Sequence, residues 1–231
     1  MFTPGSRNFV GTIPTDMVSP VDMAEQQRRI LFMMASLLLD YPADDAPAMW
    51  DHVADQCSFL PGDAAAEMQG FLSHARSCGV RTLQQEYVET FDQRRRCSMY
   101  LSYYSVGDTR QRGTAILAFS QQLEALGFTV EREELPDHLC VVLEAAARAE
   151  GEEHEKLTEI LAAHRDGIEV LRKALEQFHP GYAHVVRAVC MALPAIDQET
   201  VDNYINLIRS GPPAELVGLG TPLPFGDMER S

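Results

Sequence analysis

The residues best able to take part in chemistry lie in two short stretches of this 231-residue chain. The first, residues 86–113, combines acidic residues with three consecutive arginines and with three tyrosines inside five positions. It contains no metal ligand set, nucleophile constellation or phosphate loop. The second is Asp137-His138, where a carboxylate could orient an imidazole that titrates near neutral pH. A catalytic triad would also need a Cys or Ser nucleophile, and the sequence gives no pairing for one.

Other catalytic patterns are missing as well. A phosphate loop needs a lysine after closely spaced glycines, and the two lysines, Lys156 and Lys173, follow no such loop. A di-iron site in a helical bundle needs Glu-x-x-His twice, and the chain has it once, at Glu176 and His179. We therefore predict no catalytic residue, no metal site and no cofactor, and we interpret the first stretch as a surface for recognising a protein or peptide.

Charge and cysteine usage narrow the class of partner and the compartment. The formal net charge of −15 opposes binding to nucleic acid and to anionic membranes and favours a basic partner. The five cysteines form no CxxC pair, so we expect buried or half-buried reduced thiols. No apolar run reaches the ~20 residues that span a bilayer. The first twenty residues lack the features of a secretory signal, which predicts a cytoplasmic location without stable membrane insertion.

Apolar residues recur at three and four positions along most of the chain, and no segment alternates like a strand. The fold class is therefore all-α, a single compact bundle of about nine or ten helices. We predict a flexible N-terminal arm (1–21), a helical domain (22–210) and a Gly/Pro-rich C-terminal tail (211–231). The expected helices are 22–40, 46–56, 64–77, 81–92, one from near 110 to 127, one beginning at Pro136 or Asp137, 157–178 (one helix, or two joined at Asp166-Gly167), 182–193 and 198–210.

Several local roles stay open at this point. Asp108 or Thr109 could cap the helix near residue 110. Asp137 could simply cap its own helix, with His138 in the first turn. The arginines at 94–96 could pair with acidic helices or lie in a solvated loop. The three tyrosines could belong to the core or to an interface, where exposed tyrosines often contribute strongly to binding.

Three motifs, YVETFDQRRRC, MYLSYYSVGDTRQRG and ELPDHLCVVLE, together resemble the nitrate reductase delta-subunit family, the NarJ-type assembly chaperones. These belong to the wider group of redox-enzyme maturation chaperones. The resemblance covers roughly residues 30–208 in helix layout and is most specific at 87–113 and 135–144. The Pro136-Asp137-His138 element looks like a motif of the wider group, where it lies on a linker between helices near the client-binding region.

The resemblance implies a cytoplasmic, non-catalytic chaperone. Such a protein binds the apo form of the catalytic (alpha) subunit of a membrane-bound respiratory nitrate reductase. It recognises that subunit's N-terminal segment, a helical remnant of a twin-arginine signal, and holds the subunit until the molybdenum cofactor is inserted and the enzyme docks at the membrane. It binds no molybdenum and leaves the finished enzyme. Molybdenum cofactor delivery proteins are further candidate partners, and the resemblance leaves open whether the chaperone is a monomer or a dimer.

Eleven residues are the candidates for binding the client peptide. Acidic residues would contact the client's positive charges, aromatic residues would form the groove walls or the core beneath them, and His138 accompanies Asp137. The set is Glu86, Glu89, Asp92, Asp137, Glu144, Tyr87, Phe91, Tyr100, Tyr103, Tyr104 and His138. Two alternatives remain: a chaperone of the same fold for another molybdoenzyme with an intact twin-arginine signal, and a small helical enzyme that uses His138.

Overall fold

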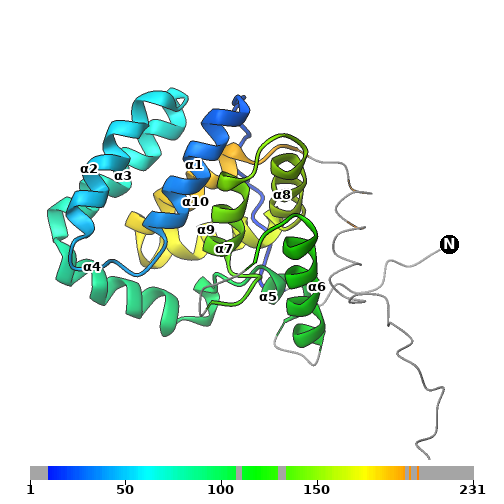
Figure 1. Cartoon of the computed structure of the whole chain (residues 1–231). Helices are drawn as coiled ribbons and strands as arrows, with labels where there is room; N and C mark the ends of the chain where they lie inside the picture. The colour runs from blue at the N-terminus through cyan, green and yellow to red at the C-terminus, as the bar shows by residue number, and fades with distance from the viewer. Residues whose placement is uncertain (1–9, 108–110, 130–133, 196–197, 199–201, 203–231) are drawn as a thin grey trace, which may run out of the picture.

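The computed structural model describes residues 10–107, 111–129, 134–195, 198 and 202, and this part of the chain is all-α (Figure 1). The α-helices that it defines are α1 (Glu25–Leu38), α2 (Ala46–Gln56), α3 (Gly62–Cys78), α4 (Val80–Tyr87), α5 (Leu101–Val106), α6 (Gln111–Ala125), α7 (Leu139–Arg148), α8 (Gly151–Ala163), α9 (Arg165–Phe178) and α10 (Pro180–Ala192). Two 3₁₀ turns, η1 (Cys57–Phe59) and η3 (Arg95–Cys97), and a π-helix, η2 (Val88–Asp92), complete them. The predicted fold class is confirmed.

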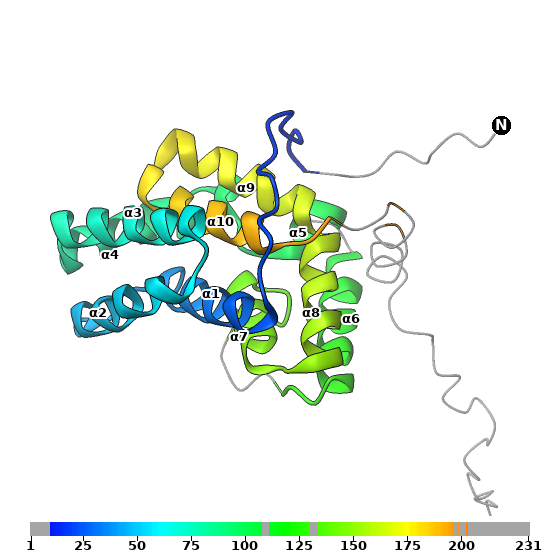
Figure 2. The same ribbon diagram turned by 90° about the horizontal axis from the view of Figure 1, so that it is seen from above.

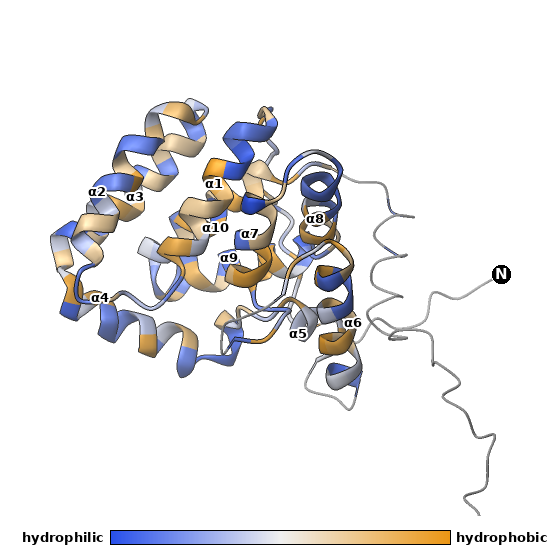
Figure 3. Ribbon diagram, in the orientation of Figure 1, coloured by the Kyte–Doolittle hydropathy of each residue, from blue (hydrophilic) through white to orange (hydrophobic). Residues whose placement is uncertain are grey.

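Helices α1, α7 and α10 form the centre of the bundle, with α1 packed against both α7 and α10. Hydrophobic residues concentrate on the central helices in Figure 3, and the interior is made of side chains that water does not reach. Leu31 and Phe32 of α1, Leu143 of α7 and Val186 of α10 have no exposed surface. Burial of this apolar surface is the main force that holds the helices together.

The long apolar pattern at 157–178 forms two helices, α8 and α9, which meet at His164. Close to this junction α5 crosses α9, because residue 167 is a glycine. A Cβ on Gly167 would lie 2.7 Å from Cβ of Tyr104, far inside ordinary contact. The sequence had left open one helix or two, and the structure shows two.

Residues 10–24, before α1, are extended and cross α9 and α10 (Figure 2). The backbone N–H of Val18 donates to Oε1 of Glu169 at 2.8 Å, and the N–H of Val21 donates to the carbonyl of Met191 at 2.8 Å. The prolines and glycines in this region predict a flexible arm over residues 1–21. They gave no sign that its second half would be fastened to the bundle.

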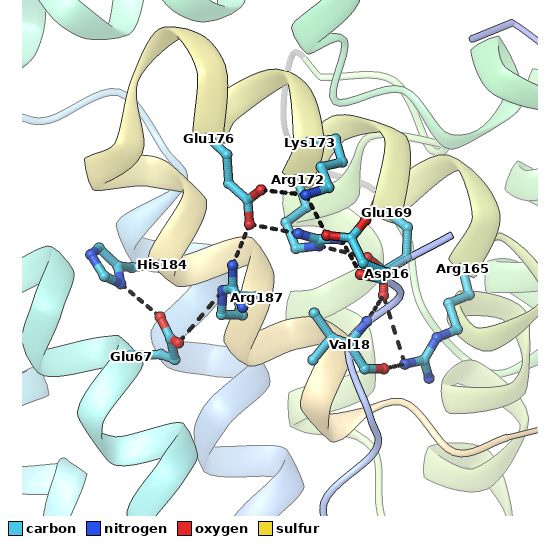
Figure 4. A network of polar contacts seen from close by, with 10 residues as sticks. All are labelled: Asp16, Val18, Glu67, Arg165, Glu169, Arg172, Lys173, Glu176, His184 and Arg187. Carbon is cyan, nitrogen blue, oxygen red and sulfur yellow. Dashed lines mark hydrogen bonds and ion pairs between the residues drawn. The ribbon is translucent and has the colours of Figure 1, made fainter. Parts of the chain in front are cut away.

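Charged side chains beneath this segment form a connected network around buried Arg172 and Glu169 (Figure 4). Arg172, which is 1% exposed, donates from Nε to Glu169 at 2.6 Å and from Nη1 to Glu176 at 2.5 Å. Arg187 also bonds to Glu176, and its Nε lies 3.6 Å from Glu67. The network supplies each buried charge with an opposite charge, which a low-dielectric interior requires.

Some predicted features fall outside the described residues. They are the cap at Asp108 or Thr109, nearly all of the helix at 198–210, and the tail at 211–231. Among the other helices, α2 spans the predicted 46–56, and α10 begins two residues before the expected start at 182. By contrast, α8 begins at Gly151, six residues before the expected start at 157, and α5 was not predicted.

Candidate functional site

The loop before α7 is joined to the start of α5, so the second and third of the motifs quoted above meet in space. The N–H of Leu101 donates to the carbonyl of Asp137 at 2.9 Å, and the N–H of Leu139 donates to the carbonyl of Met99 at 2.8 Å. Between these two bonds, Tyr100 and His138 face each other as an isolated antiparallel bridge. The two motifs therefore build one local structure from residues almost forty positions apart.

Asp137 is fully buried inside this junction. Its Oδ2 accepts a 2.5 Å hydrogen bond from Oγ of Ser102, in the first turn of α5. Burial raises the pKa of Asp137, and the Ser102 bond and the charge of Arg112 partly oppose that rise. The expectation that Asp137 begins or caps its own helix is wrong: α7 begins at Leu139, and the carboxylate contacts the start of another helix.

His138 occupies the N-cap position of α7 and is 6% exposed. Its ring packs edge-to-face against Tyr100, with 5.2 Å between the ring centroids. Oδ2 of Asp137 accepts from Ser102 and not from the neighbouring imidazole.

A pocket of about 290 Å³ opens beside this junction. It is walled by the π-helix η2, by the chain around η3, by the first residues of α5 and α6, and by the loop before α7. Its lining is Tyr87, Phe91, Asp92, Arg94, Arg95, Ser98, Met99, Tyr100, Tyr103, Arg112, Glu134 and His138.

The aromatic wall owes its shape to the π-helix. The N–H of Gln93 donates to the carbonyl of Val88 at 3.1 Å, a five-residue step that widens the helix by one residue, as is frequent at functional sites. The rings of Tyr87 and Phe91 lie 4.9 Å apart, and that of Phe91 packs against buried Tyr182 of α10 at 5.0 Å. The aromatic wall therefore packs directly against the hydrophobic core.

The charged groups of the pocket carry both signs. Asp92 and Glu134 are acidic, whereas Arg94, Arg95 and Arg112 are basic. The guanidinium of Arg112 lies 4.9 Å from the ring centroid of Tyr100, in cation–π contact. Burial and the nearby carboxylate of Glu134 raise the pKa of Tyr100, so its phenol stays protonated and can donate a hydrogen bond.

Six of the eleven predicted residues line this pocket, namely Tyr87, Phe91, Asp92, Tyr100, Tyr103 and His138. The other five do not. Tyr104 is core, with its hydroxyl bonded to the carbonyl of Ser98 at 2.7 Å. Asp137 lies beneath the pocket. Glu144 is 3.4 Å from Arg148 along α7, Glu89 lines a separate surface hollow, and Glu86 contacts His74.

Sequence reasoning missed the other six lining residues, namely Arg94, Arg95, Ser98, Met99, Arg112 and Glu134. Arg112 lies in the first turn of a helix, and Glu134 lies in an acidic stretch that could be interpreted only as a linker. Helical periodicity assigns a face within one helix. It does not show which loop will come to lie opposite that face.

Among the described helices none is long and apolar enough to cross a membrane. All five cysteines are free thiols, four buried and Cys78 half-buried, in agreement with the prediction.

Comparison with known proteins gives a consistent result. Residues 59–186 match the family described as nitrate reductase delta subunit, over more than half of the chain. The chain is 31% identical to the nitrate reductase molybdenum cofactor assembly chaperone NarJ of Escherichia coli K12 over 184 residues, 76% of this chain and 75% of the relative. It is 28% identical to NarJ of Bacillus subtilis strain 168, over 79% of this chain and 99% of that one.

A third relative is much longer. The nitrate reductase-like protein NarX of Mycobacterium tuberculosis is 36% identical over 161 residues, and the chain spans only 24% of its length. A crystal structure titled as a redox enzyme maturation protein from Archaeoglobus fulgidus superposes with a TM-score of 0.51 and 23% identity, covering 73% of this chain and 93% of that one. That likeness concerns the fold alone. Taken together, the matched residues and the NarJ relatives place this chain in the nitrate reductase delta-subunit family.

Proposed function

We propose that this chain is an assembly chaperone for the catalytic (alpha) subunit of a respiratory nitrate reductase, and not an enzyme. Its relatives from Escherichia coli and Bacillus subtilis are molybdenum cofactor assembly chaperones for nitrate reductase by name. The observation that carries the proposal is that the chain's family-specific motifs converge on one pocket, with aromatic walls and charges of both signs.

The segment bound is the N-terminal part of the apo subunit, folded as an amphipathic helix. Such a helix places large apolar side chains at three- and four-residue intervals, which suits a wall of Tyr87, Phe91 and Tyr103. A pocket of about 290 Å³ holds one or two anchoring side chains rather than a whole helix. The rest of the helix would lie along the neighbouring surface.

Charge would set the orientation of the bound helix. Asp92 and Glu134 can pair with basic client residues, and Arg94, Arg95 and Arg112 can pair with acidic ones. The acidic chain as a whole attracts a basic segment from a distance. The chaperone would act in the cytoplasm and hold the subunit during molybdenum cofactor insertion. It would bind no molybdenum of its own and would separate before the enzyme reaches its final assembly.

The test is co-elution in size-exclusion chromatography. The apo catalytic subunit, with and without its N-terminal segment, is mixed with the full chain. The proposal expects a complex with the intact subunit and none with the truncated one. Equal binding of both forms would place the contact elsewhere on the subunit. A parallel run with leader peptides from other molybdoenzymes tests the alternative client: preference for an intact twin-arginine leader would overturn the nitrate reductase assignment.

A further inference from the structure

His74, Cys78 and Glu86 form a cluster outside the pocket that the proposed function does not use. One ligand atom from each residue lies within 4.8 Å of the other two. His74 and Cys78 are four positions apart in the last turns of α3, so their side chains share one helix face. Glu86 comes from α4, which turns back against α3 after the single residue Gly79, at φ +78°.

We propose that this cluster binds a divalent transition metal ion, with Zn²⁺ the best match, and that the ion cross-links α3 to α4. Imidazole nitrogen, thiolate sulfur and carboxylate oxygen are the donors that Zn²⁺ takes in proteins. Three protein ligands with an open fourth position is a known arrangement for this ion.

A tetrahedral site sets the distances between its ligand atoms. Bond lengths of about 2.0 Å to nitrogen and oxygen and about 2.3 Å to sulfur place the ligand atoms roughly 3.3–3.5 Å from one another. Nε2 of His74 and Oε2 of Glu86 are now 2.7 Å apart, in a direct hydrogen bond. Insertion of the ion would part these two atoms by less than an ångström.

The ligands are held in place yet remain accessible. The side chains of His74 and Glu86 are 33% and 21% exposed, so an ion and a water molecule can enter from solvent. The ring of His74 packs on the backbone of α10, where a Cβ on Gly181 would lie 2.8 Å from Cγ of that ring. The last turn of α3 also carries the negative end of the helix dipole, which favours a cation.

A second observation points to the same place. Tyr182 is fully buried, and its hydroxyl has no hydrogen-bond partner among the residues that the structure describes. Tyr182 follows Gly181 in α10, and the ring of His74 packs on Gly181, so Tyr182 lies beside the cluster. An ion-bound water or the second oxygen of Glu86 would give this donor a partner.

Binding would release a proton. Burial, together with the charge of Glu86, raises the pKa of the Cys78 thiol, so at neutral pH the sulfur carries its hydrogen. Coordination forms the sulfur–metal bond while the thiol proton goes to solvent, and affinity therefore rises with pH. The sequence analysis predicted no metal site because its metal-binding patterns were CxxC and paired Glu-x-x-His, and the residues of this cluster have neither spacing.

The experiment uses the full chain, stripped with chelator and titrated with Co²⁺ and then with Zn²⁺. We expect one equivalent of Co²⁺ to give a thiolate-to-cobalt charge-transfer band in the near ultraviolet, and Zn²⁺ to abolish it. C78S should remove the band, and H74Q should weaken Co²⁺ binding at least tenfold. Circular dichroism of each metal-free variant shows that it is folded.

The matched control is H184Q. His184 contacts Glu67 at 2.6 Å, a pair much like that of His74 and Glu86 but with no thiol in the cluster, and its variant should titrate like the parent chain. Absence of the band in the parent chain would overturn the proposal. So would a band that persists in both C78S and H74Q. Client binding is not part of the readout, so failure here leaves the chaperone proposal intact.

Discussion

The carboxylate of Asp137 accepts a 2.5 Å hydrogen bond from the hydroxyl of Ser102, and this contact fastens the loop before α7 to the first turn of α5. Both side chains are fully buried. The bond lies directly beneath the pocket, whose lining residues Tyr100 and His138 are neighbours of the two partners in the chain. The junction therefore fixes the geometry of one pocket wall.

Replacing Ser102 by alanine should destabilise the chain. The substitution removes the side-chain donor to Asp137 and leaves a buried carboxylate without it, which costs about 1–3 kcal/mol. Urea unfolding of the full chain measures the loss. S120A is the control, since the hydroxyl of Ser120 donates to exposed Glu124 on α6, and its free energy of unfolding should change by no more than about 0.5 kcal/mol. Equal effects of the two variants would show that the buried bond contributes nothing.

The raised pKa of Asp137 predicts a pH dependence. In the unfolded chain the group ionises near pH 3.9, and in the folded chain it ionises at higher pH. Between these two values the folded state holds more protons, so the stability due to this group falls as pH rises through that window. The side chain introduced in D137N is neutral at every pH, so this variant lacks the pH-dependent contribution of Asp137 to stability. Unfolding free energies of both proteins from pH 4 to pH 7 should show the parent chain losing stability relative to D137N; parallel curves would contradict the assignment.

His164 should act in the opposite direction. It is fully buried with Nδ1 2.8 Å from the carbonyl of Ile160, and burial lowers its pKa to about 4. The unfolded chain takes up a proton near pH 6.5 and the folded chain resists it, so stability is lost as pH falls from 6.5 towards 4. The shift corresponds to about 3 kcal/mol. H164Q should lose less stability than the parent chain as pH falls from 6.5 towards 4, as measured by urea midpoints at each pH. The same pH dependence in both proteins would count against a buried neutral imidazole at position 164.

The network under the N-terminal segment gives a fourth prediction. E169A removes the acceptor for the N–H of Val18 and one of the carboxylates that neutralise buried Arg172, which should cost about 3–5 kcal/mol. The control is D51A, which breaks the exposed pair between Asp51 and Arg76, for a loss of about 1 kcal/mol at most. Thermal and urea unfolding compare the two. Similar losses would show that residues 10–24 are not anchored through Glu169.

Much of the fold could be predicted from the sequence because its signals are local. Three- and four-residue periodicity, together with prolines and glycines, located α2, α3 and α10 to within two residues. Such signals could not show where the N-terminal segment docks. Its anchor, Glu169, lies 151 residues from Val18 in the chain, and the contact exists only after α9 has packed.

The candidate site could also be predicted from the sequence only in part. The aromatic residues Tyr87, Phe91, Tyr100 and Tyr103 cluster in the sequence and also in the pocket. Acidic residues were selected for their charge alone, and three of them, Glu86, Glu89 and Glu144, lie apart from it. The π-helix altered the expected helical register after Tyr87, and its five-residue step has no marker in the sequence.

Salt should weaken client binding if charge guides the encounter. Charges separated by more than about 8 Å are screened at physiological ionic strength, so the long-range attraction of a −15 chain for a basic segment fades as salt is added. Titration of the N-terminal client peptide at increasing salt should show a steady fall in affinity. Affinity that does not change with salt would leave the aromatic wall as the source of binding.

The most direct test of the proposed function is isothermal titration of the full chain with a peptide that spans the N-terminal segment of the nitrate reductase catalytic subunit proposed as its client. The account predicts saturable one-to-one binding, weakened at least tenfold by Y100A, because Tyr100 joins the pocket wall to both Arg112 and His138. F59A removes an aromatic ring of similar size, 55% exposed and outside the pocket, and should bind like the parent chain. Absence of binding by the parent chain, or equal binding by Y100A and F59A, would contradict the account.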